Sequence, residues 1–276
     1  MNYPIIAFIG GGNMAASLIR GLIKSGFPKD KIWVSDRNAP KRDRLKQELG
    51  IHTTTVNKEA SEKAQVVIIA VKPKDVQAVA NELRETLKKG NHLLISIAAG
   101  ISTGLLQKWF GNHLPIVCAI PNTPALLQVG ATGLYANGRV TEDQREMAES
   151  ILRSVGLTVW VDHEHEMSIL SALSGSGPAY FFLFMESLQK GSEHLGLSAK
   201  VAKLLTLQTA LGAARMAIET ESSLAELMKG VATPGGTTEQ ALKCFESGNI
   251  RALCEAALEA AKSRSLEIGQ IFEKEG

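Results

Sequence analysis

The chain has 276 residues, 45% of them hydrophobic and 21% charged, with a formal net charge of +2. This length predicts two domains, the composition is that of an ordinary globular protein, and the small net charge argues against a nucleic-acid partner. No stretch approaches 18 consecutive apolar residues, no basic segment precedes the first strand pattern, and the three cysteines lack a CxxC spacing. We therefore expect a cytoplasmic protein without membrane contact or signal peptide.

The part of the chain before Asp162 alternates two patterns. Apolar runs suited to buried parallel strands lie at 5–9, 32–35, 66–71, 93–97, 116–120 and 158–161. Between them, the segments 13–25, 41–49, 74–87 and 142–155 have helical spacing. Thr141 and Gln144 form a capping-box pattern before the last of these. Strand and helix alternation predicts an α/β domain with a doubly wound parallel sheet over residues 1–162.

Beyond Asp162 the strand patterns stop. Helices are predicted at 166–173, 178–195, 198–219, 224–229, 238–246 and 250–272. We therefore expect an all-helical second domain over residues 163–276. Its plentiful apolar residues predict either a self-contained bundle or one that a second copy completes, and we favour a homo-oligomer.

The first strand pattern runs directly into a glycine turn that opens a helix. Residues 10–15 read Gly-Gly-Gly-Asn-Met-Ala and match G-x-G-x-x-A. Such glycines permit a tight turn and let backbone amides approach a pyrophosphate at the positive end of the helix. A purely structural turn is the alternative, but the strand before and the helix after favour dinucleotide binding.

The end of the second strand predicts the choice of cofactor. Asp36 there could accept hydrogen bonds from a ribose 2′-hydroxyl and favour NADH. Arg37, with Lys41 and Arg42 one turn later, would instead attract the 2′-phosphate of NADPH. The remaining possibility is that Asp36 only caps a turn and the basic residues form a solvated face. We favour NADPH, with NADH possible.

Two later strands end in segments suited to the same edge of the sheet. Ala98, Ala99 and Gly100 are small enough to leave room for a nicotinamide. Lys72 could serve as a catalytic acid or, because it precedes Pro73, only shape the loop.

A second glycine turn lies far along the chain, at 234–238, and reads Pro-Gly-Gly-Thr-Thr. At a helix start, its exposed amides could form a nest for a carboxylate with a hydroxyl beside it. An ordinary Pro-Gly turn before a Thr-capped helix explains the same residues equally well.

Five segments together narrow these alternatives: AVKP at 70–73, SIAAG at 96–100, PNTPAL at 121–126, LSGSGPAY at 173–180 and ATPGGTTEQAL at 232–242. In order and spacing, over nearly the full length, they resemble the pyrroline-5-carboxylate reductase family. The resemblance implies an N-terminal Rossmann-type parallel sheet domain and an all-helical C-terminal dimerisation domain. It further implies reduction of L-1-pyrroline-5-carboxylate to L-proline with NADPH or NADH, and a homodimer, often assembled into a ring.

The resemblance also implies roles for individual residues. Those of the pyrophosphate site are Gly10, Gly11, Gly12, Asn13 and Met14; those of the adenosine site are Ser35, Arg37 and Asn57; those of the nicotinamide site are Val71, Lys72, Pro73 and Ala99. The amides of Gly235, Gly236 and Thr237 would bind the substrate carboxylate. Thr238 would hydrogen-bond the ring nitrogen as the catalytic residue, with Glu221 also near the ring. The chain departs from the family at Cys118, where arginine is common.

Other interpretations of the sequence are weaker. A β-hydroxyacid dehydrogenase would share the two-domain pattern, but its helical lysine has no counterpart closer than Lys190. A non-catalytic cofactor-binding scaffold would not need the second glycine turn. The His163 and His165 pair sits among acidic residues but lacks the spacing of known metal motifs, so we expect no metal.

Overall fold

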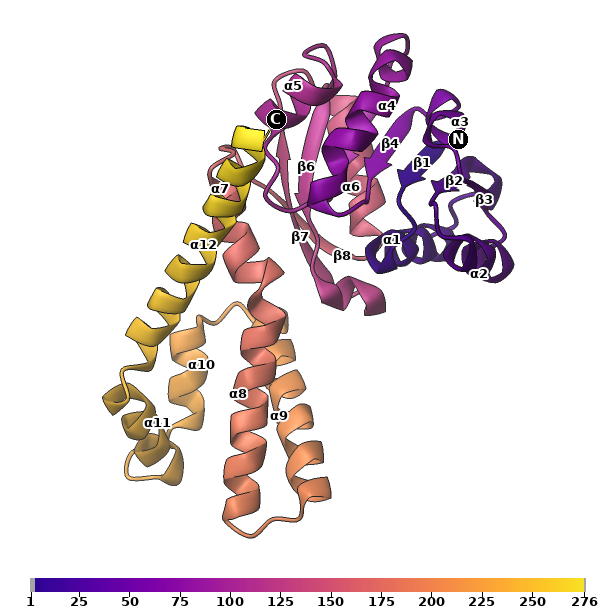
Figure 1. Cartoon of the computed structure of the whole chain (residues 1–276). Helices are drawn as coiled ribbons and strands as arrows, with labels where there is room; N and C mark the ends of the chain where they lie inside the picture. Colours follow the sequence, from indigo (N-terminus) through magenta and orange to yellow (C-terminus); the bar gives the residue numbers. More distant parts are fainter. Residues whose placement is uncertain (1–2, 276) are drawn as a thin grey trace. The chain divides into compact units, whose positions relative to one another are not determined.

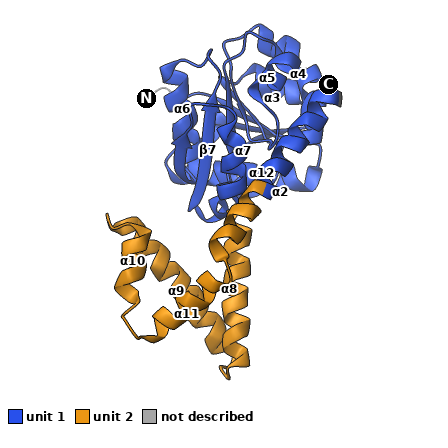
Figure 2. Cartoon of the chain, turned by 90° about the vertical axis from the view of Figure 1, so that its left-hand side faces the viewer, with its two compact units in different colours: residues 1–176, 260–276 blue, residues 177–259 orange. Residues whose placement is uncertain are grey.

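The computed structural model describes residues 3–275. The chain divides into two compact units (Figure 2). The first comprises Met1–Ser176 together with Ala260–Gly276, and the second comprises Gly177–Glu259.

The first unit is built on one eight-stranded sheet (Figure 1). Its strands are β1 (Ile6–Ile9), β2 (Ile32–Ser35), β3 (His52–Thr54), β4 (Val66–Ile69), β5 (Leu93–Ser96), β6 (Ile116–Ile120), β7 (Gly130–Ala136) and β8 (Gly156–Trp160). Their order is β3-β2-β1-β4-β5-β6-β7-β8. Strands β1 to β6 are parallel, β7 is antiparallel to β6, and β8 is parallel to β7. The order reverses between β1 and β4, where such sheets bind ligands beyond the strand ends.

Helices cover both faces of the sheet. They are α1 (Asn13–Lys24), α2 (Ala39–Leu49), α3 (Asn57–Glu62), α4 (Val76–Lys88), α5 (Thr103–Phe110), α6 (Glu142–Arg153) and α7 (Glu166–Leu170). Because successive strand residues point to opposite faces, β1 gives Ile6 and Phe8 to one core and Ala7 and Ile9 to the other. The first core includes residues of α1, α2 and α6, and the second includes residues of α3, α4, α5 and α7. The α/β sheet architecture is confirmed, as is the capping box that begins at Thr141.

All six expected strands are present, and the structure adds two more, β3 and β7. Strand β7 makes the sheet mixed rather than wholly parallel. Its sequence, GATGLYA, lacks the β-branched and aromatic run that marks a strand. Its glycines have a packing role instead, since a Cβ at Gly133 would lie 2.3 Å from the Cδ1 atom of Leu170 on α7. Only the neighbouring elements reveal this strand.

The second unit is helical, with α8 (Gly177–His194), α9 (Ala199–Glu219), α10 (Leu224–Val231), α11 (Thr237–Ser247) and the start of α12 (Ile250–Glu275). The Ser198 side chain caps α9, and Ser223 with Glu226 forms a capping box on α10. The division at residue 176 comes later than the expected boundary at 162. Residues 163–176 belong with the sheet because α7 packs on β7. The end of α12 also belongs to this first unit, and its residue Ile268 packs against Gly100.

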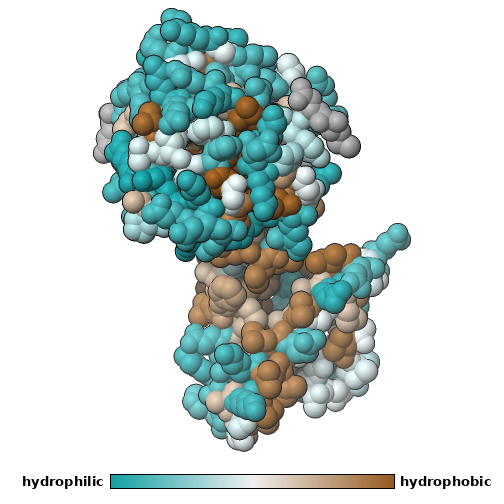
Figure 3. Space-filling model, turned by 90° about the vertical axis from the view of Figure 1, so that its right-hand side faces the viewer, coloured by the Kyte–Doolittle hydropathy of each residue, from teal (hydrophilic) through white to brown (hydrophobic). Residues whose placement is uncertain are grey.

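Large apolar side chains of the second unit face outward. Phe181, Leu204 and Ile218 are 70%, 60% and 81% exposed, and Gly177 and Ala202 are its buried residues among those described. Figure 3 shows this apolar surface spread over the helices. The helical stretch of residues 166–194, which runs from α7 through a π-helical segment to α8, has the length and hydropathy of a membrane span. Only 17% of its most apolar 18-residue window is buried. A unit that leaves so much apolar surface uncovered lacks a core of its own.

Candidate functional site

The first glycine turn has a backbone that only glycine accommodates at Gly10. Its φ is +104°, and a Cβ there would lie 2.7 Å from the carbonyl oxygen of Ala70. The Gly10 amide donates to the Ser35 carbonyl at 2.7 Å. The turn after β1 is thus fixed against the ends of β2 and β4, the strands on either side.

Gly12, unlike Gly10, has open space at its Cβ position. It is the N-cap of α1 with φ −71° and ψ 179°, no atom lies within 4 Å of its ideal Cβ position, and no side chain caps the helix. Asn13 and Met14 begin the helix directly after it. The first amides of a helix have no partner within the helix, so they are oriented to bind an anion above Gly12.

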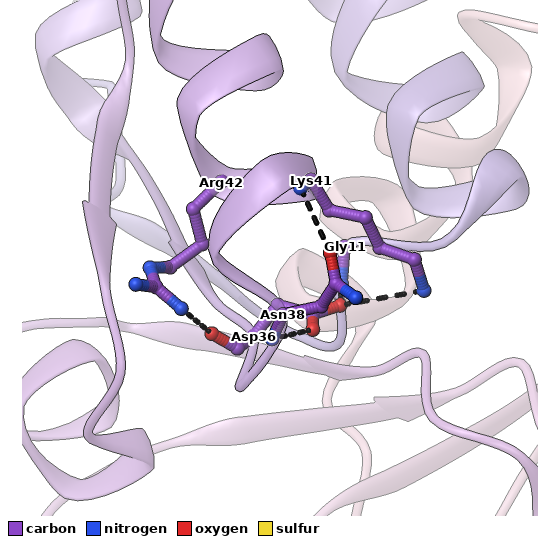
Figure 4. A network of polar contacts seen from close by, with 5 residues as sticks. All are labelled: Gly11, Asp36, Asn38, Lys41 and Arg42. Atoms are coloured by element: carbon purple, nitrogen blue, oxygen red, sulfur yellow. Dashed lines mark hydrogen bonds and ion pairs between the residues drawn. The ribbon is translucent and has the colours of Figure 1, made fainter.

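Asp36 holds the end of β2 to the glycine turn (Figure 4). Its Oδ2 atom accepts from the Gly11 amide at 2.8 Å and lies 4.0 Å from the Lys41 ammonium, while Oδ1 accepts from the Asn38 amide at 2.8 Å. Arg42 donates to the Asp36 backbone carbonyl at 2.7 Å. Both carboxylate oxygens are therefore engaged within the protein. The Gly11 amide, expected to approach the pyrophosphate, is directed to Asp36 instead.

A cavity of about 440 Å³ opens beside this network. Residues from the ends of β1, β2 and β4 and from α3 and α4 line it: Gly10, Gly12, Ser35, Asp36, Arg37, Lys41, Asn57, Ala70, Val71, Lys72, Lys74, Asp75, Ala78 and Val79. The structure thus brings together residues of the expected pyrophosphate, adenosine and nicotinamide sites. Four basic side chains, Arg37, Lys41, Lys72 and Lys74, give the cavity a cationic rim.

Ser35 and Asn57 are joined inside this cavity. The buried Ser35 hydroxyl donates to Asn57 Oδ1 at 2.7 Å, and Asn57 Nδ2 donates to Glu82 at 2.8 Å. Glu82 lies on α4 and was not expected near the site. It orients the Asn57 amide, and no local sequence pattern marks it.

The expected nicotinamide residues lie at the ends of β4 and β5. Pro73 begins a short 3-10 turn after Lys72, and Ala99 is exposed between Ala98 and Gly100. Those two neighbours line a second cavity of about 390 Å³, which also contacts Cys118 and Glu164. Pro73 and Ala99 line neither cavity.

Cys118 stands where arginine is common in the family, and it is 7% exposed. Its thiol lies 3.6 Å from the Ile101 carbonyl oxygen. Burial, and then the negative charge of Glu164, raise the pKa of this thiol far above its usual range. Cys118 is therefore an unreactive packing residue rather than a nucleophile.

The second glycine turn begins α11. Gly235 has φ +72°, and Gly236 is the N-cap. The Gly235 amide donates to the Glu239 carboxylate at 2.8 Å, and the Gly236 amide donates to the Thr233 carbonyl at 3.0 Å. Two of the three amides expected to converge on a substrate carboxylate thus have partners within the chain. Sequence reasoning missed Glu239, although an acid three residues after an N-cap is a known capping signal.

Thr238 and Glu221, the expected catalytic residue and its companion, lie on either side of α10 in the sequence. Thr238 is half-buried, and in the described part of the chain its hydroxyl makes no hydrogen bond. Glu221 is exposed and precedes α10, and Thr238 lies in the first turn of α11.

The histidines at 163 and 165 stack with ring centroids 5.5 Å apart. Over residues 3–275, no group of three metal-ligating side chains that could hold an ion is found.

Comparison with known proteins covers nearly the whole chain. A family model described as pyrroline-5-carboxylate reductase dimerisation matches residues 164–268, and one described as NADP oxidoreductase, coenzyme F420-dependent, matches residues 5–100. The Pseudomonas aeruginosa pyrroline-5-carboxylate reductase is 48% identical over 270 residues, 98% of either chain.

Solved structures agree with the sequence comparisons. A pyrroline-5-carboxylate reductase from Coxiella burnetii has 50% identity and a TM-score of 0.94, covering 97% of this chain and 99% of that one. The Plasmodium falciparum pyrroline carboxylate reductase with NADP bound has 29% identity and a TM-score of 0.86, covering 98% and 99%. With a glycine turn, a cationic cavity at the sheet's switch point and a helical dimerisation unit, this chain belongs to the pyrroline-5-carboxylate reductase family.

Proposed function

We infer that the protein reduces L-1-pyrroline-5-carboxylate to L-proline with NAD(P)H, the last step of proline biosynthesis. One observation carries this inference: curated reductases of that name align with the chain over nearly its whole length, at up to 48% identity. The apolar window at 166–194 falls within the matched dimerisation region, so oligomerisation accounts for its hydropathy.

The first unit fits a nicotinamide dinucleotide. The close approach of Gly10 to Ala70 leaves no room for a side chain, and the open N-terminus of α1 offers amides to a pyrophosphate. When bound, the cofactor supplies the hydride. The protein would hold the cofactor in place for this transfer. Its contacts would be Gly12, Asn13 and Met14 at the pyrophosphate, Ser35, Arg37 and Asn57 at the adenosine, and Val71, Lys72, Pro73 and Ala99 at the nicotinamide.

NADPH is the preferred cofactor in this proposal. Arg37 is exposed at the rim of the cavity and, among the described residues, has no hydrogen-bond or ion-pair partner. A 2′-phosphate would give its guanidinium a planar, doubly charged partner. Asp36 is a weak candidate for reading the 2′-hydroxyl of NADH, because its carboxylate oxygens already accept two backbone hydrogen bonds.

The turn before α11 is proposed to hold the substrate. The amides of Gly235, Gly236 and Thr237 would bind the substrate carboxylate once the first two leave their partners Glu239 and Thr233. The Thr238 hydroxyl, which has no hydrogen bond among the described residues, would donate to the imine nitrogen. When that nitrogen is protonated, the same neutral hydroxyl can accept from its N–H without repelling the iminium charge. Glu221, which precedes α10, is proposed to lie near the substrate ring as well.

The protein is an oligomer built on its helical unit, and we propose that it forms a homodimer and then a ring of dimers. The outward-facing apolar side chains of α8 and α9 support this, since water-exposed apolar surface on that scale favours association. We further propose a cytoplasmic location, which the three free cysteines support.

The decisive experiment is a steady-state assay of the purified protein with L-1-pyrroline-5-carboxylate and each cofactor. We expect proline to form with both cofactors and a lower KM for NADPH. Turnover of a β-hydroxy acid with NADP⁺, without imine reduction, would instead support the dehydrogenase alternative.

A further inference from the structure

Glu239 places a carboxylate of the protein on the turn proposed to receive the substrate carboxylate. Its Oε2 atom accepts from the Gly235 amide at 2.8 Å. Its Oε1 atom lies 3.1 Å from the Lys243 ammonium, one helical turn further along α11. The Glu239 side chain is 36% exposed and that of Lys243 is 61% exposed, so solvent and solutes reach both groups.

The contact differs from an ordinary capping box in one respect. In a capping box the acid at the third helical position accepts from the amide of the N-cap itself. Here the N-cap is Gly236, whose amide donates to Thr233, and Glu239 reaches one residue further back. Gly235, whose amide Glu239 reaches, has a left-handed backbone with φ +72°.

We propose that Glu239 is an internal competitor of the substrate carboxylate for the Gly235 amide, and that Lys243 holds the Glu239 side chain once the substrate displaces it. The proposal rests on the function inferred above and names a residue that sets substrate affinity. An N–H group directed at one oxygen cannot serve a second carboxylate equally well, and two neighbouring anions repel. Substrate binding is then an exchange of one carboxylate for another.

The two members of the pair have opposite effects. Glu239→Gln keeps an acceptor oxygen for the Gly235 amide, so the start of α11 is retained, but it removes the charge that repels the substrate. We expect the substrate KM to fall about two- to tenfold, the range of one net hydrogen bond. Lys243→Met removes the alternative partner of Glu239, and we expect the substrate KM to rise. In the Glu239→Gln background, Lys243→Met should have no further effect.

The experiment measures kcat and KM for all three variants with L-1-pyrroline-5-carboxylate and with 1-pyrroline, the same ring without the carboxylate. Only the carboxylate-bearing substrate should respond to Glu239→Gln. The NADPH KM should stay unchanged, because neither Glu239 nor Lys243 lines the cofactor cavity. Glu62→Gln, which removes the acid of another lysine–glutamate pair four residues apart, with Lys58 on α3, is the control.

A Glu239→Gln protein with an unchanged or raised KM for pyrroline-5-carboxylate overturns the proposal and leaves Glu239 a helix cap. A lowered KM for both imines also overturns it, because the effect then does not depend on the carboxylate. Melting curves establish that each variant is folded. If the wild-type protein reduces neither imine, the proposed reductase function is wrong. If it reduces them but the variants do not behave as expected, only the proposed competition by Glu239 is wrong.

Discussion

Gly12→Asp should abolish cofactor binding while leaving the fold intact. Gly12 is an N-cap with an extended backbone that any residue adopts, and its ideal Cβ position meets nothing within 4 Å. Aspartate is also a favoured N-cap, and replacing glycine with aspartate there changes stability by only a few tenths of a kcal/mol. The new carboxylate would lie above the helix start, where we place the pyrophosphate.

The size of the loss follows from charge. A carboxylate about 4 Å from one phosphate charge is repelled by roughly 4 kcal/mol at an effective dielectric constant of 20. At about 1.4 kcal/mol per decade, this corresponds to a loss in NADPH affinity on the order of a thousandfold. Gly12→Asn, which has nearly the same shape, is also a preferred cap and lacks the charge, so it should lose much less.

Fluorescence titration with NADPH measures the affinity of the three proteins, and thermal melting without cofactor measures their stability. The expected pattern is equal melting temperatures and an affinity order of wild type, then Asn, then Asp. If the folded Asp variant binds NADPH as the wild type does, the pyrophosphate does not lie above Gly12. If Asn and Asp lose affinity equally, the cause is steric rather than electrostatic.

Four further predictions test the remaining parts of the proposed site. Arg37→Ala should raise the KM for NADPH much more than the KM for NADH in parallel assays, because only NADPH carries the 2′-phosphate; an equal change would make the backbone or Asp36 the determinant. Thr238→Val should lower kcat/KM about ten- to a hundredfold, from a lost hydrogen bond of roughly 1.5–3 kcal/mol, with NADPH affinity unchanged; wild-type kinetics would remove the hydroxyl from the mechanism. Light scattering at micromolar concentration should show at least a dimer, and a lone 29.6 kDa species would reject obligate assembly. Iodoacetamide should label Cys118 only after unfolding, because the thiol is buried and its pKa is raised; peptide mass spectrometry that finds it labelled in the native protein would contradict this placement.

Local patterns in the sequence determined much of the architecture. The buried strands of the parallel part, the helix that starts after Gly12 and the capping box at Thr141 follow from hydrophobic spacing and end signals, which act over a few residues. The glycine turn was predictable for the same reason, since a strand, a turn and a helix follow one another in the chain. The family resemblance added roles for single residues that spacing alone leaves open.

Tertiary structure decided what depends on residues far apart in the chain. β7 exists because β6, β8 and α7 pack around a glycine-rich segment with little strand propensity of its own. The Asp36 carboxylate accepts a hydrogen bond from the amide of Gly11, 25 positions away. The Glu82 carboxylate accepts one from the side chain of Asn57 at the same separation. Such contacts depend on where the packed elements direct each side chain, because hydrogen bonds require both distance and direction. The sequence alone therefore predicts Asp36 as a candidate for binding the ribose. Only the fold shows that each of its carboxylate oxygens already accepts a backbone hydrogen bond.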